Sequence, residues 1–120
     1  MFDDDDEAPV WDKEAALQRV RGKEKFLVSL VELFLKDMPA RIDDLEKTVA
    51  NMDVPEVQSI GHAVKGVAAN LSSIALSEFA SKIEQAAKKN HTEAIEMLMP
   101  KLRDAHTDVT DMFTEYLASK

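Results

Sequence analysis

The sequence predicts an all-α protein that folds as an antiparallel up-and-down four-helix bundle with a short extra N-terminal helix. Three observations support this fold class. Apolar residues recur at spacings of three and four through most of the 120-residue chain. Only three glycines and four prolines are present, which disfavours a turn-rich β fold. The predicted connections are short, and short connections place successive helices antiparallel.

We interpret residues 1–10 as a flexible acidic leader or linker and residues 11–120 as the bundle domain. Acidic runs such as residues 3–7 are typical of solvated tails. The short helix is expected over residues 11–20, with Asp12 as its cap, Glu14 in its first turn and Gly22 after its end. Trp11 is expected to be a packing anchor.

Two long helices are predicted to continue through a proline. One runs from Lys23 to about Asn51 and the other starts at His91 and runs to near the end of the chain. The apolar spacing stays in phase across Pro39 and Pro100, so each is one kinked helix. The stripe of the first comprises Phe26, Leu27, Leu30, Val31, Phe34, Leu35, Met38, Ile42, Leu45, Val49 and Met52.

Two shorter helices lie between the long ones, over residues 56–73 and 74–89. Pro55 is expected at the first helical position of one, and Ser73 can cap the other. Asn90 suits the left-handed residue after a helix end. On the second short helix the inward residues are Leu76, Phe79, Ala80, Ile83 and Ala87, and the outward ones are Lys82, Glu84, Lys88 and Lys89.

The helix over residues 56–73 has an unusual outer face. Opposite its apolar stripe lie His62 and Gly66, with Gln58, Ala69 and Ser73 beside them. In a protein with 32% charged residues, a solvated face would normally carry Glu and Lys pairs. The face therefore indicates a surface that a partner approaches closely.

Gly66 and Lys65 favour a chemical role for His62 over that of an ordinary surface histidine. A glycine inside a helix costs about 0.5–1 kcal/mol relative to alanine, and Gly66 clears the space one turn after the imidazole. Lys65, three residues after His62, can place a cation beside an anion on the ring. A neutral imidazole is nucleophilic near neutral pH. The pattern is typical of a phosphate-accepting histidine.

The run His62-Ala63-Val64-Lys65-Gly66 resembles the H-x-x-K-G signature of histidine-containing phosphotransfer (HPt) domains, and the resemblance extends over nearly the whole chain. It departs from the family pattern at Ser72, where many members have glycine, and at Val67, where a small hydroxyl residue is common.

This resemblance implies a phosphotransfer intermediate of a multistep two-component phosphorelay. His62 would accept the phosphoryl group of a receiver-domain aspartate and pass it to another receiver, with Lys65 stabilising the phosphoryl group and Gly66 admitting the receiver. Gln58, Ala69 and Ser73 would belong to the docking face. The chain would bind no cofactor, because the family places magnesium on the partner receiver domain. An upstream hybrid sensor kinase is a further partner that the resemblance allows, and we expect a monomer.

Several other functions are disfavoured. The net charge is −8, of which residues 3–7 supply five, and the chain has no concentrated basic face for nucleic acid. No glycine-rich loop is present to bind ATP, so no kinase activity of its own is expected. His91 and His106 lack metal-site spacing. No apolar run could span a bilayer, and the absence of cysteine fits a reducing compartment, so a cytoplasmic location is expected.

Two alternatives use the same histidine-bearing face. A helical adaptor would bind its partner there without chemistry. A dimerising histidine-kinase domain also presents a histidine on a helix, but it requires an adjoining ATP-binding domain.

Overall fold

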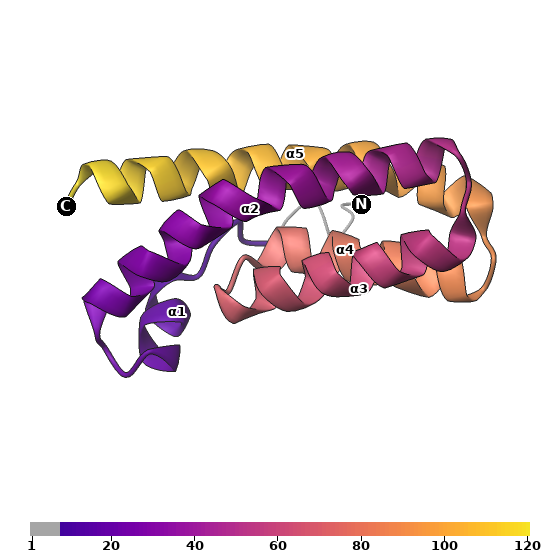
Figure 1. The fold of residues 1–120 in the computed structure, drawn as a ribbon. Coiled ribbons are helices and arrows are strands. Elements are labelled where there is room, and N and C mark those ends of the chain that lie inside the picture. Colours follow the sequence, from indigo (N-terminus) through magenta and orange to yellow (C-terminus); the bar gives the residue numbers. More distant parts are fainter. Residues whose placement is uncertain (1–7) are drawn as a thin grey trace.

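The computed structural model describes residues 8–120, which form five helices and no strand. The prediction of an all-α bundle is therefore confirmed (Figure 1). The helices are α1 (Lys13–Arg19), α2 (Glu24–Ala50), α3 (Val54–Asn70), α4 (Ile74–Lys88) and α5 (Thr92–Ala118).

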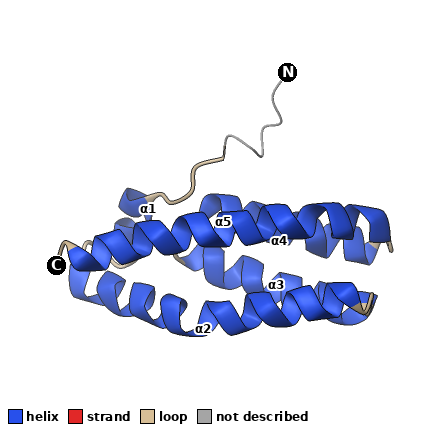
Figure 2. Ribbon diagram, turned by 90° about the horizontal axis from the view of Figure 1, so that it is seen from above, coloured by secondary structure: helices blue, strands red, loops and turns tan. Residues whose placement is uncertain are grey.

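The four longer helices form a closed ring in which α2 packs on α3, α3 on α4, α4 on α5, and α5 back on α2. α2 and α5 have 27 residues each, whereas α3 and α4 have 17 and 15. The long pair therefore extends beyond the short pair at one end of the bundle. Figures 1 and 2 show α1 at this end, where α2 begins and α5 stops.

Both long helices continue through their prolines, as the unbroken phase of the apolar stripe predicted. Pro39 lies inside α2 and Pro100 inside α5, and both side chains are exposed. Because Pro39 and Pro100 face solvent, the stripe on the opposite side continues into the core. The largest fully buried side chains come from all four helices and include Leu27, Met38, Ile42, Leu45, Val57, Val64, Leu76, Ile83, Ile95, Leu102 and Phe113.

The segment before α1 is tied to the bundle through its backbone and through Trp11. The Pro9 carbonyl accepts a hydrogen bond from Ala75 N (3.0 Å), and Trp11 Nε1 donates to the Leu71 carbonyl (2.7 Å). The indole packs edge-on against Phe113, as the expected anchor would. Residues 1–7 lie outside the described residues, but residues 8–10 contact the core or cap α4. Residues 8–10 therefore pack with the bundle.

Four local predictions differ from the structure. Phe26 and Leu30 were placed in the buried stripe but are 59% and 38% exposed, because the first turns of α2 extend past the end of α3. Pro55 is the second residue of α3, because Asp53 is the N-cap. Ser73 occupies the N-cap position of α4, but its hydroxyl makes no capping bond.

The loop between α3 and α4 contains a non-glycine residue in the left-handed region. Ser72 has φ +56°, and its carbonyl accepts a hydrogen bond from Asp12 N (3.0 Å). This conformation lets Ser73 N donate back to the Ala68 carbonyl, which closes the end of α3. Glycine adopts it without steric strain, whereas other residues lose roughly 1–2 kcal/mol. Of the two positions at which the sequence departs from the HPt pattern, Ser72 is thus one where the backbone favours glycine.

We predict that Ser72→Gly raises the free energy of unfolding by about 0.5–1 kcal/mol, because relief of the left-handed strain exceeds the added entropy of the unfolded chain. Urea unfolding measures the change. Asn90→Gly is the matched control, since Asn90 also has φ +57° but asparagine tolerates it better. A destabilised Ser72→Gly protein would contradict this account.

Candidate functional site

His62 lies in the middle of α3 with its side chain 68% exposed. Val57, Val64 and Ala68 on the opposite side of the same helix are completely buried. The apolar stripe therefore fixes how α3 is rotated, and this rotation directs His62 outward. A rigid helix thus presents an accessible imidazole.

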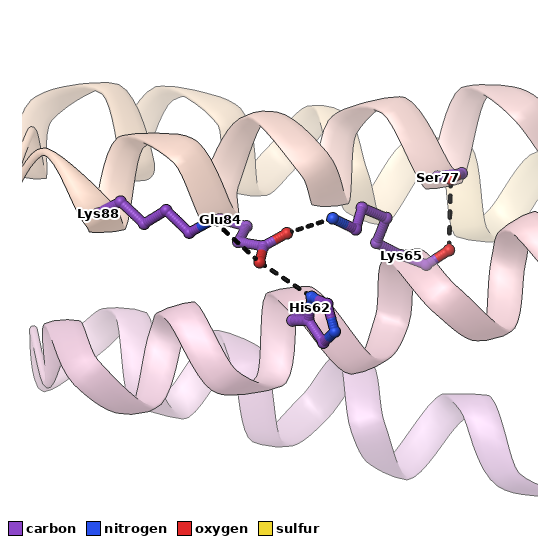
Figure 3. A network of polar contacts seen from close by, with 5 residues as sticks. All are labelled: His62, Lys65, Ser77, Glu84 and Lys88. Carbon is purple, nitrogen blue, oxygen red and sulfur yellow. Dashed lines mark hydrogen bonds and ion pairs between the residues drawn. The ribbon is translucent and has the colours of Figure 1, made fainter.

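The imidazole is held by a carboxylate that the sequence interpretation placed outside. Glu84 of α4 is only 4% exposed, and its Oε2 lies 2.9 Å from His62 Nδ1. Lys65 Nζ forms an ion pair with Glu84 Oε1 at 2.7 Å, and Lys88 Nζ lies 3.7 Å from Oε2. Figure 3 shows these three partners converging on Glu84 from different sides. The prediction that Glu84 faces outward was wrong.

Gly61, the residue before His62, accounts for the reach of Glu84. A Cβ added to this buried glycine would lie 3.5 Å from the Ala80 carbonyl oxygen and 3.6 Å from Glu84 N. The backbones of α3 and α4 are therefore close at this level, and a longer side chain would separate them. Glu84 N is one of these neighbouring backbone atoms. The side chain of Glu84 can therefore reach the imidazole of His62, the residue that follows Gly61.

The carboxylate of Glu84 is kept ionised by its neighbours. The Lys65 ammonium group lowers the pKa of Glu84 and His62 adds to this effect, against burial, which raises the pKa. A carboxylate only accepts hydrogen bonds, so a neutral His62 must carry its proton on Nδ1. Nε2 is then the unprotonated nitrogen, and Figure 3 shows it pointing away from Glu84. The arrangement selects one nucleophilic atom.

The predicted docking residues are not all at the surface. Gly66 is exposed, and a Cβ added there would meet no other group within 4 Å, so the helix is open beside His62. Gln58 and Ala69 are half-buried on the same helix. Ser73 is 0% exposed, which corrects its assignment to the docking face. The helix ends at Asn70, so the angular position inferred for Ser73 does not apply.

An apolar surface lies between α2 and α3, beyond Gly66 toward the C-terminal end of α3. A groove of about 210 Å³ between these helices is lined in part by Leu30, Leu33, Val67 and Asn70. Leu33 is 53% exposed. Sequence reasoning placed Leu30 in the core and did not single out Leu33, because a helical stripe does not show where the neighbouring helix stops. We call this groove the α2–α3 apolar face.

The described residues give little support for a metal site, for a role of the other two histidines or for a membrane-spanning helix. Within residues 8–120, no group of three or more His, Cys, Asp or Glu side chains could hold a metal ion. His91 is exposed at the start of α5, and His106 is half-buried beside Phe34, where burial lowers its pKa. In the same part of the chain, no helix combines the length and the apolar character needed to cross a bilayer.

We predict that Glu84 makes the stability of the protein depend on acidic pH. Its pKa is lower in the folded chain than its ordinary 4.5, so its stabilising contribution is complete above the unfolded value and is lost as pH falls through the folded value. Urea unfolding at pH 7 and pH 3 should therefore show a smaller difference in Glu84→Gln than in the wild type. Glu78→Gln, at an exposed position of α4, is the control. Equal pH dependence in both variants would contradict the prediction.

Comparisons with known proteins agree with the geometry. The family described as "Hpt domain" matches residues 29–113. No curated protein matches closely enough to compare. Histidine-containing phosphotransfer protein B from Pseudomonas aeruginosa superposes with a TM-score of 0.86 at 17% identity, covering 93% of this chain and 97% of that one.

Two further solved structures share the fold. The HPT domain of a sensor hybrid histidine kinase from Shewanella gives a TM-score of 0.82 at 17% identity, covering 92% of this chain and 96% of that one. The maize histidine-containing phosphotransfer protein ZmHP2 gives 0.75 at 18% identity, with coverages of 92% and 83%. The family match spans the bundle from within α2 to within α5, so the chain belongs to the Hpt domain family, whose members carry out histidine phosphotransfer in two-component phosphorelays.

Proposed function

We propose that His62 accepts a phosphoryl group from the phosphorylated aspartate of one receiver domain and passes it to the aspartate of another. The observation that carries this proposal is the exposed imidazole, whose Nδ1 is held by the buried carboxylate of Glu84. This bond leaves Nε2 as the atom that can attack. The same geometry serves both directions of transfer.

The proposed step requires no proton transfer. The Nε2 lone pair forms a bond to phosphorus as the bond between phosphorus and the aspartyl oxygen breaks, and the aspartate carboxylate leaves with the electron pair. Nδ1 keeps its proton, and Glu84 stabilises the positive charge that develops on the ring. Most of the rate enhancement comes from positioning the two groups in line. In the second transfer, the aspartate of another receiver attacks the phosphorus and the bond between phosphorus and Nε2 breaks.

Lys65 is proposed to stabilise the phosphoryl group. It is on α3, one turn from His62, and its side chain is 31% exposed, so it can turn toward solvent. The remaining charge neutralisation is assigned to magnesium on the receiver. On this proposal the chain binds no cofactor and uses no ATP. We propose that the exchange takes place in the cytoplasm. A chain without cysteine is compatible with the reducing conditions there.

The receiver is proposed to dock over Gly66 and the α2–α3 apolar face. Gly66 leaves the helix surface open, while Gln58 lies one turn before His62 and Ala69 two turns after it on the same helix. Exposed side chains such as Leu33 would be removed from water by an apolar patch on the receiver. A single patch of this kind engages one receiver at a time, and the chain acts as a monomer.

We predict that His62→Gln abolishes phosphoryl transfer while the fold remains intact, because the exposed ring contributes little to packing. Incubation with a phosphorylated receiver and detection of acid-labile, base-stable phosphate would measure labelling, and circular dichroism would check the fold. His91→Gln is the control, since His91 is also exposed. Retained labelling of His62→Gln would overturn the proposal. A wild-type chain that binds receivers without becoming labelled would be an adaptor.

We predict that Gly66→Gln stabilises α3 by about 0.5–1 kcal/mol but lowers the rate of transfer from a receiver at least tenfold. The side chain has space within the chain, so it disturbs only a partner that approaches closely. Transfer reactions quenched at a series of times would give the rate, and urea unfolding would give the free energy of unfolding. Thr107→Gln on α5, diagonally across the bundle from α3, controls for an added surface side chain. An unchanged transfer rate would refute docking over Gly66.

A further inference from the structure

The Lys65 ion pair creates a conflict that the proposed function has to resolve. Lys65 Nζ lies 2.7 Å from Glu84 Oε1 in the unphosphorylated chain, yet the same ammonium group is needed beside a phosphoryl group on His62. One ammonium group cannot remain in close contact with both anions if they lie on different sides of the ring. Phosphorylation therefore sets Glu84 and the phosphoryl group in competition for Lys65.

Glu84 does not release a cation freely. Its side chain is only 5% exposed, so water cannot replace Lys65, and an ionised buried carboxylate without a partner is costly. The hydrogen bond from His62 Nδ1 persists after Nε2 is phosphorylated. It satisfies Glu84 Oε2, but Oε1 loses its partner when Lys65 moves away. A second cation near Glu84 would lower the cost of releasing Lys65.

Lys88 is a second cation beside this carboxylate, and it lies on the side of Oε2 rather than Oε1. It lies one turn after Glu84 on α4, with Nζ 3.7 Å from Oε2, which is too long for a hydrogen bond but close enough for attraction. Its side chain is 46% exposed and therefore has room to move inward. Figure 3 shows Lys88 and Lys65 reaching Glu84 from opposite sides. Lys88 also lines a hollow together with His62, Gln58 and Ser59.

We infer that Lys88 is a reserve cation for Glu84, which moves into contact with the carboxylate when Lys65 turns to the phosphoryl group on His62. This inference rests on the proposed role of His62. Lys88 is then a positioning residue, because it acts on the phosphoryl group only through Glu84 and Lys65. The exchange keeps the buried carboxylate paired in both states of the chain.

The ionisation of the phosphoryl group tests this inference directly. Phosphoramidate can label the exposed His62 without a receiver: Nε2 bonds to phosphorus and ammonia leaves. A phosphoryl group on nitrogen keeps an ionisable oxygen, as a phosphate monoester does with its second pKa of about 6, and a cation in contact with the phosphoryl group lowers this pKa. Titration followed by ³¹P NMR gives this pKa in the labelled, folded chain. The wild type should titrate at a lower pH than Lys65→Met, which removes the contact.

Lys88→Met should raise the phosphoryl pKa by about 0.5 pH units, because Glu84 then retains Lys65. Lys88→Arg should restore the wild-type value. Lys89→Met is the matched control, since Lys89 is the exposed neighbour at the end of α4. A pKa for Lys88→Met equal to that of the wild type, or for Lys65→Met equal to that of the wild type, would overturn the inference.

A double variant separates the exchange from a direct contact. If Lys88 acts through Lys65, Lys88→Met adds no shift in a Lys65→Met background. An additive shift would mean that Lys88 contacts the phosphoryl group itself, which would overturn the reserve role. A receiver that fails to label His62 would refute the proposed function instead, while the phosphoramidate titration would still decide the role of Lys88.

Discussion

The site depends on the contact between the buried carboxylate of Glu84 and the imidazole of His62. This contact exists because α3 and α4 approach closely at Gly61, one residue before the histidine. The helix pair thus fixes both the orientation of the ring and the nitrogen that carries its proton. A histidine on the same helix without this neighbour would be exposed but free to rotate and to change tautomer.

The same arrangement uses groups that would be unfavourable in an ordinary core. Burying a carboxylate costs free energy, which is offset by the ion pair with Lys65, by the hydrogen bond to His62 and by Lys88 nearby. Gly66 also lowers the stability of α3 while leaving the surface open. Such local costs are found at functional sites, because a partner or a reaction, rather than packing, selects these residues.

Much of the fold could be predicted from apolar spacing, including the continuity of α2 and α5 through Pro39 and Pro100. The predictions were wrong about where helices end and about how far neighbouring helices run alongside each other. Leu30 has the spacing of a core residue but is exposed, because α3 is shorter than α2. Ser73 was assigned an angular position on a helix that ends before it. Spacing reports the rotation of a residue around its own helix, and it carries no information about where the neighbouring helix stops.

The sequence by itself determined the bundle class and the outward direction of His62 and Gly66, because each depends on the periodicity of one helix. Only the tertiary structure decided that Glu84 faces the histidine, since the two residues are 22 positions apart and their contact depends on the spacing of two helices. One local signal existed, because Ala80, Ile83 and Ala87 surround Glu84 on the buried stripe of α4. A charged residue at the border of a stripe can face water or a partner, and packing alone distinguishes the two.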